Sequence, residues 1–222
     1  MFNNGMIPIY YDAEFTGLHK DTTLISIGLL SGRSGSHFYA EFTDYDKSQV
    51  TDWIAENVIT KLPYKYVDNY LSHLAPFEHN DIDWRFYDVV MKDDSTEIKE
   101  RLISWLKNES QHGQVKLQFY TDCYAYDWVL MNHLICDEGS ALNIPEFISY
   151  IPMDLSTILQ ANSIDPDISR EEFVGESALA RIKNKVPFIH WGDENIKHNS
   201  LWDAFVCKEC FDKIDTLTRI AG

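Results

Sequence analysis

Three apolar-rich runs near the start of the chain have the alternation that is typical of buried β-strands. They cover residues 7–15, 22–30 and 37–42, and a glycine-bounded turn at residues 32–35 joins the second run to the third. We expect these strands to pair in order as an antiparallel meander. The sheet is therefore predicted to begin with three antiparallel strands.

Helical and strand patterns alternate through the rest of the chain. Helices are predicted over residues 48–59, 95–108, 123–135, 155–161 and 200–220. In the first of them, Trp53 is predicted on the apolar face with Ile54 and Val58. Two more strands are predicted over residues 115–121 and 147–151. This order predicts an α/β fold with a mixed five-stranded sheet flanked by helices.

Two stretches fit neither pattern and are interpreted as insertions in a single domain that spans residues 1–222. Residues 64–94 are irregular and rich in aromatic side chains, and residues 163–197 form a polar stretch with a small basic cluster. A chain of this length is compatible with one large α/β domain.

The composition limits the classes of partner. The formal net charge of −16 disfavours long, sequence-independent tracking along nucleic acid, which depends on a basic surface. It does not exclude a short polyanion held at one metal site, where the cation supplies positive charge. No apolar run approaches the ~18 residues of a membrane span, and no secretory signal pattern is present, so we expect a cytoplasmic protein with no membrane partner.

Two acids interrupt the first predicted strand. Asp12 and Glu14 project from the same strand face, about 6.6 Å apart along the chain. A desolvated carboxylate is costly unless it is paired or bound to a cation. A solvent-facing strand edge would also accommodate the pair.

Two predicted helices carry acids in the same unexpected setting. Asp127 shares an apolar stripe with Leu130, and Asp203 shares one with Cys207, each acid lying in the first helical turn. The helix dipole favours a negative charge in the first turn, which accounts for part of this placement. Four converging carboxylates would resist ionising unless a divalent cation neutralised them. Oxygen ligands favour Mg²⁺ or Mn²⁺, and two such ions suit in-line phosphoryl displacement.

The four cysteines admit two interpretations. Cys207 and Cys210 form a CKEC motif, which occurs in zinc sites and redox pairs. A closed zinc site needs about four ligands, and Cys123 and Cys136 do not form a second such pair. Because the motif lies in a helical pattern, buried thiols in a reducing compartment are favoured.

Three spaced motifs resemble a known group of proteins. Asp12-x-Glu14, then Asp127 inside TDCYAYDWVL, then His198-x4-Asp203 inside HNSLWDA resemble the DEDDh superfamily of 3′-to-5′ exonucleases. The segments YYDAEFTGL, DTTLISIGLL, VITKLP and AYDWVL are most similar to the mycobacterial Rv2179c-like family of exoribonucleases. The resemblance implies a ribonuclease H-like fold and release of 5′-mononucleotides.

The resemblance also implies roles for the acids and the histidine. Asp12, Glu14, Asp127 and Asp203 would hold two divalent ions, Mg²⁺ or Mn²⁺. His198 would be the general base, a task that suits a side chain with a pKa near neutrality.

Further positions are implied to bind the substrate. Phe15, Thr16, Gly17 and Leu18 match the segment that receives the terminal nucleotide, although strand alternation points Phe15 towards the core. Asp122 takes the place of an asparagine in many relatives, and its position also matches a helix N-cap.

The implied partner is RNA, attacked at single-stranded or overhanging 3′ ends. A DNA exonuclease with the same site and a catalytically silent binding module are the alternatives. A homodimer is compatible with the resemblance.

Overall fold

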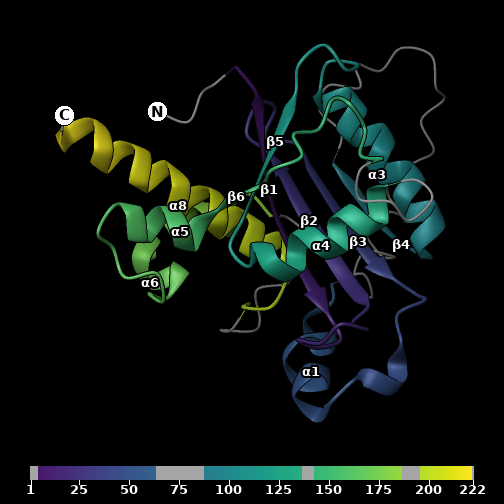
Figure 1. Ribbon diagram of the computed structural model, residues 1–222. Helices are drawn as coiled ribbons and strands as arrows, with labels where there is room; N and C mark the ends of the chain where they lie inside the picture. Colours follow the sequence, from purple (N-terminus) through teal and green to yellow (C-terminus); the bar gives the residue numbers. More distant parts are fainter. Residues whose placement is uncertain (1–4, 64–87, 137–142, 187–195, 222) are drawn as a thin grey trace.

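Six strands form one mixed sheet in the order β4-β3-β2-β1-β5-β6 (Figure 1). The computed structural model describes residues 5–63, 88–136, 143–186 and 196–221. The strands are β1 (Ile7–Phe15), β2 (Leu24–Ser31), β3 (His37–Phe42), β4 (Val89–Asp93), β5 (Leu117–Thr121) and β6 (Met153–Asp154). β1, β2 and β3 are antiparallel neighbours, whereas β4, β5 and β6 each pair in parallel.

The predicted fold class is confirmed. The antiparallel meander lies where the alternation placed it, and the mixed sheet with helices on its faces is the ribonuclease H-like architecture that the resemblance implies. The prediction of five strands is wrong by one, because β4 lies inside the stretch 64–94 that was interpreted as an irregular insertion. Its apolar residues are consecutive and so lack the alternation of a strand.

The strand predicted over residues 147–151 is also displaced. Ile148 makes only an isolated parallel bridge to Leu117, and the sheet continues instead at β6. The Gln118 side chain donates to the Ile151 carbonyl at 2.6 Å, so a side chain, not the backbone, contacts this residue. Pro152 follows directly and has no N–H to donate.

Helices cover both faces of the sheet. They are α1 (Asp52–Asn57), α3 (Ser95–Glu109), α4 (Tyr124–Ile135), α5 (Leu155–Ala161), α6 (Arg170–Val174), α7 (Glu176–Lys183) and α8 (Ser200–Ala221), with 3₁₀ turns at Lys47–Gln49 and Ile59–Lys61. The helix predicted over 48–59 is thus broken into three pieces, and the described part of the stretch 163–197 contains α6 and α7. Residues 64–87 and 187–195 of the predicted insertions lie outside the described residues. Among the described helices, none combines the length and apolar character needed to cross a membrane.

Alternation along β1 separates two apolar cores. Tyr10 packs on the face covered by α8 and its neighbours, whereas Ile9 and Tyr11 pack on the opposite face against α3 and α4. Burying an aliphatic side chain such as Ile9 contributes about 1.5–3 kcal/mol. Asp12 and Glu14 follow the phase of Tyr10, so they project towards α8.

The start of α8 lies directly on β2 at Gly28. A Cβ atom at this position would come within 2.3 Å of the Leu201 amide nitrogen and 2.4 Å of the Leu201 Cα. Both are backbone atoms, so no side chain can move aside. Gly28 pairs with Asp12 on β1, and this close approach therefore brings the first turn of α8 beside the acids of β1.

The Gly28→Ala variant tests this contact. We expect it to lower the free energy of unfolding by about 1–3 kcal/mol or more, because the helix backbone must shift. Thermal unfolding measures the loss, at about 2–4 °C per kcal/mol for a domain of this size. Gly113→Ala is the control, since a Cβ there meets no atom within 4 Å and only its positive φ of 87° adds strain. Equal losses in the two variants would contradict the steric account.

Candidate active site

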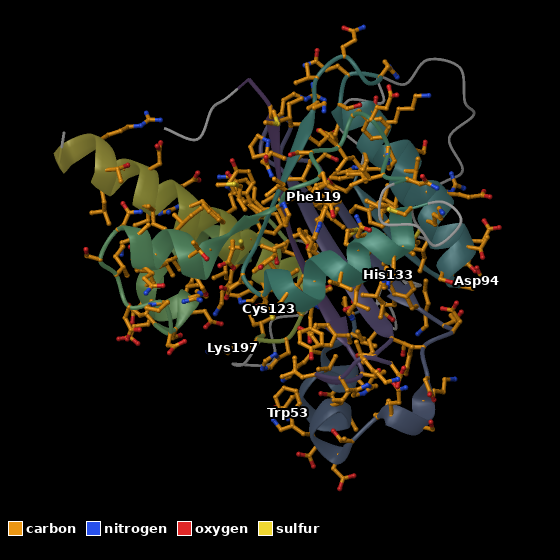
Figure 2. All side chains as sticks on the ribbon, viewed as in Figure 1. Trp53, Asp94, Phe119, Cys123, His133 and Lys197 are labelled. Carbon is orange, nitrogen blue, oxygen red and sulfur yellow. The ribbon has the colours of Figure 1, made fainter. Side chains whose placement is uncertain are left out.

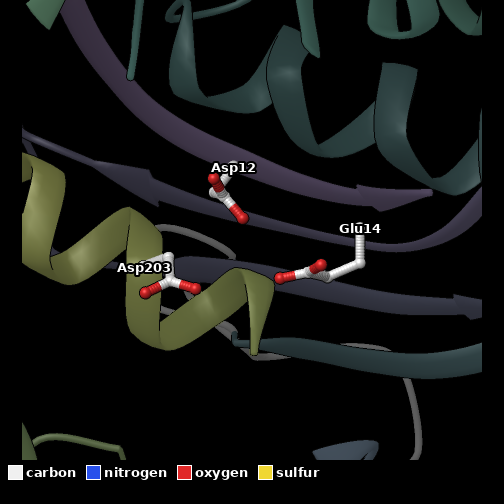
Figure 3. A group of neighbouring side chains, drawn as sticks. All are labelled: Asp12, Glu14 and Asp203. Carbon is white, nitrogen blue, oxygen red and sulfur yellow. The ribbon is translucent and has the colours of Figure 1, made fainter. Parts of the chain in front are cut away.

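Three carboxylates meet where β1 faces the first turn of α8. Oxygen atoms of Asp12, Glu14 and Asp203 all lie within 4.8 Å of one another. Figure 3 shows the three side chains directed towards a common space, two from the strand and one from the helix. Strand alternation and the helix start together bring these predicted residues into one cluster.

The junction before α8 fixes both His198 and Asp203. The Asn199 side chain accepts a hydrogen bond from the Trp202 amide at 3.1 Å, as expected of a helix cap. His198 adopts a left-handed backbone conformation with φ of 64°, and its amide donates to the Asp203 carboxylate at 3.0 Å. The backbone of the predicted base is thus tied to a predicted metal ligand.

Asp127 lies beside the three acids but outside their closest group. One of its carboxylate oxygens accepts a hydrogen bond from the Thr121 hydroxyl at 2.5 Å. Its other oxygen, Oδ1, is buried and has no hydrogen-bond partner among the described residues. A buried polar atom in this state is rare in proteins. This free oxygen fits the ligand role that the resemblance implies.

The acids resist ionisation. Burial raises the pKa of Asp12 well above its usual value, and the charges of Asp127, Asp203 and Glu14 add to the shift. Burial and Asp203 raise the pKa of Glu14 in the same way. Burial also raises the pKa of Asp127 to about 7. At neutral pH the ionised cluster therefore opposes folding, and a divalent cation would remove the repulsion.

His198 lies at the edge of this cluster. Its Nδ1 atom is 4.0 Å from Glu14 Oε1, and its side chain is 41% exposed. Its ring makes an edge contact with Trp53, with 5.1 Å between ring centroids. Burial lowers the pKa of His198, and the charge of Lys197 lowers it further, so the neutral form that accepts a proton is favoured.

The acids open into a cavity of about 880 Å³. Its walls also include the side chains labelled Trp53, Cys123 and Lys197 in Figure 2. A volume of this size is within the range of small-molecule sites. The cavity has room for a nucleotide beside the carboxylates.

Residues 15–18 all line the cavity, but they differ in exposure and in the groups that they contact. Leu18 is 71% exposed and is available for contact. Thr16 is buried, and its hydroxyl contacts Gln49 at 2.5 Å and accepts from the Thr23 amide at 2.9 Å. Phe15 stacks on Tyr126, with ring centroids 5.5 Å apart. This contact agrees with the prediction from strand alternation that Phe15 points towards the core. Gly17 has no side chain, so its backbone forms part of the cavity wall.

Asp122 lines the cavity but does not cap α4. The capping position is Cys123, and it makes no side-chain capping bond, so the N-cap alternative is wrong. Both Asp122 oxygens instead accept hydrogen bonds from Arg170, at 2.7 and 2.8 Å. The carboxylate is therefore already engaged by another side chain.

The prediction for Trp53 is wrong. It was predicted on an apolar face, yet it is 55% exposed and lies at the cavity. The Thr51 hydroxyl caps α1 by accepting from the Ile54 amide, so the helix begins later than predicted. Ile54 and Val58 are buried, whereas Trp53 is not. The threonine before an acidic first turn was a signal for this boundary.

The prediction that the CKEC motif contributes buried thiols is confirmed. Cys207, Cys210 and Cys136 are buried, whereas Cys123 is exposed. Cys207 additionally lines the floor of the cavity beside Asp203.

Comparison with known proteins finds no matching family model and no matching curated protein. One of the solved structures that match is a zinc-bound form of E. coli ExoI in complex with single-stranded DNA. The identity is 11% and the TM-score is 0.48, over 97% of this chain and 41% of that one. This chain thus spans less than half the length of that protein.

The Asp12→Asn variant tests whether the acids repel one another. Because the folded-state pKa of Asp12 is raised, its ionised form lowers stability as pH rises above about 4. At pH 7 in EDTA, we expect Asp12→Asn to raise the melting temperature, by about 2–4 °C per kcal/mol recovered. Mn²⁺ should stabilise the wild type and not the variant.

Asp21→Asn is the matched control, since its side chain is 67% exposed and pairs with the exposed Lys20, away from the three acids. A melting temperature in EDTA that falls or stays constant in Asp12→Asn would contradict the repulsion.

Proposed function

We propose that this chain is a metal-dependent 3′-to-5′ exonuclease that releases 5′-mononucleotides. The observation that carries the proposal is the cluster of Asp12, Glu14 and Asp203 at an open cavity, with His198 at its edge. Oxygen-only donors with raised pKa values fit hard divalent cations such as Mg²⁺ or Mn²⁺.

The four acids would share the metal ions. Asp12, Glu14 and Asp203 supply the closely spaced oxygens, and Asp127 supplies its unpartnered Oδ1. When bound, two such ions supply Lewis-acid stabilisation of the attacking and leaving oxygens in phosphodiester hydrolysis. The carboxylates contribute the negative charge that retains the ions at this end of β1.

His198 would accept the proton of the attacking water. Its lowered pKa keeps the imidazole neutral at pH 7, and its partial exposure leaves a ring nitrogen accessible from the cavity. The hydrogen bond from its amide to Asp203 sets its position relative to the acids. General-base catalysis of this kind contributes about 10²–10⁴-fold to a rate.

Two exposed apolar side chains favour a single-stranded end as the substrate. Leu18 and Trp53 both line the cavity, 71% and 55% exposed. Stacking of a base on an aromatic side chain contributes about 1–3 kcal/mol and requires an unpaired base. The net charge of −16 disfavours extended contacts with a long polyanion. A short 3′ end or overhang fits both features.

RNA is proposed as the preferred nucleic acid. The support is the similarity of YYDAEFTGL and AYDWVL to the Rv2179c-like exoribonucleases. DNA remains the competing substrate, because discrimination depends on a contact to the 2′-hydroxyl. The single-domain organisation, the cytoplasmic location and the homodimer stay predictions.

A substrate panel tests this function. We expect the purified chain to shorten 3′-overhang and single-stranded RNA from the 3′ end, releasing 5′-mononucleotides, with Mg²⁺ or Mn²⁺ and not with EDTA. DNA of the same sequence should be cleaved more slowly. Faster cleavage of DNA would replace the RNA proposal, and no cleavage of either with both metals would contradict the nuclease.

His198→Ala and Asp12→Asn are the controls for contaminating nucleases. His198→Ala should lower the rate by about 10²–10⁴-fold while Mn²⁺ still stabilises the protein. The wild-type rate should rise with pH through a pKa below the usual histidine value, since the neutral imidazole is the active form. Retention of the full rate in both variants would favour the silent binding module.

A further inference from the structure

Residues 166–171 form one continuous wall of the cavity, here called the 166–171 wall. Most of the wall precedes α6 and has neither helical nor strand pairing to hold it. One backbone turn bond, from the Ile168 amide to the Asp165 carbonyl at 3.2 Å, holds part of this segment, and side-chain hydrogen bonds must hold the rest. The wall lies in the stretch 163–197, for which the resemblance gives no role.

Arg170 makes the bonds that fix the wall. Its Nη2 and Nη1 atoms donate to the carbonyls of Pro166 and Ile168, at 2.9 and 2.6 Å. Nε and Nη2 also donate to both oxygens of Asp122, and Nη2 reaches the Ser156 hydroxyl at 2.8 Å. All three guanidinium nitrogens are therefore engaged. The Arg170 side chain is only 17% exposed, so the contacts are shielded from solvent.

Two adjacent residues at one end of the wall, Arg170 and Glu171, contact the segments that precede the two helices carrying site residues. Asp122, which Arg170 binds, lies two residues before the start of α4, which contains Asp127. Glu171 pairs with Lys197 at 2.8 Å, next to His198. This end of the wall thus contacts both the segment before α4 and the segment before α8.

We propose that Arg170 is a positioning residue that holds the 166–171 wall in the shape that receives the terminal nucleotide. This inference rests on the proposed exonuclease function. Arg170 acts through Asp122 and the wall carbonyls and not on the reacting atoms. The planar fork of arginine satisfies a bidentate carboxylate and two carbonyls together, which the single ammonium group of lysine cannot do.

The Arg170→Lys variant tests the inference with the best single-stranded substrate of the wild type. We expect KM to rise about 10-fold or more, as for the loss of a partner that orients a site residue, with kcat little changed. Mn²⁺ should stabilise the variant as it does the wild type, because no proposed metal ligand is altered. Asp122→Asn should raise KM in the same direction and serves as the milder variant if Arg170→Lys does not fold.

The double variant Arg170→Lys/Asp122→Asn separates one coupled unit from two independent contacts. Its KM should match that of the more affected single variant, because both substitutions break the same interaction. Arg181→Lys is the matched control, since Arg181 pairs with Glu209 at 2.8 Å outside the cavity lining and is 57% exposed. Its KM should equal that of the wild type.

The outcomes distinguish this inference from the proposed function. A wild type that cleaves no nucleic acid overturns the exonuclease and this inference with it. A wild type that cleaves, with an Arg170→Lys KM equal to that of the Arg181→Lys control, overturns the positioning role alone. A fall in kcat at constant KM, or loss of Mn²⁺ stabilisation in Arg170→Lys, also overturns it.

Discussion

The close approach of α8 to β2 at Gly28 is the contact on which the site depends. A helix backbone can approach a strand to this distance only where the strand residue has no Cβ, and Gly28 lies opposite Asp12 in the sheet. The first turn of α8 then brings Asp203 beside the acids of β1. Ser200 adds a hydrogen bond to Ser26 at 3.0 Å in the same contact. Without this approach, the helix and strand acids would face separate environments.

The same contact creates an electrostatic cost that the two apolar cores must offset. Burial raises the pKa of Asp12, Glu14 and Asp203, so each resists the charge that a metal ligand needs. The sheet tolerates the acids because Tyr10 and Tyr11 on the same strand pack into extensive cores on opposite faces. Holding the carboxylate oxygens together thus lowers the stability of the fold at this site, as is common where a protein binds a cation.

The sequence predicts the parts of the site that depend on local periodicity. Alternation along β1 gives the common face of Asp12 and Glu14, and helical phase places Asp203 in the first turn of α8. Long-range contacts leave no such signal. Asp122 and Arg170 are 48 residues apart and belong to no periodic pattern, so their bidentate pair was not predicted. Trp53 was missed for a local reason, since the Thr51 cap changes the phase of a short helix.

The central claim is that Asp12, Glu14 and Asp203 bind divalent metal because α8 brings them together. Anomalous diffraction from Mn²⁺-soaked crystals of the wild type and of Asp203→Asn tests it most directly. The account predicts an anomalous peak at ligand distance from these three carboxylates in the wild type, and a weakened or absent peak in the variant. A wild type that binds no Mn²⁺ there, or binds it only elsewhere on the chain, would contradict the account.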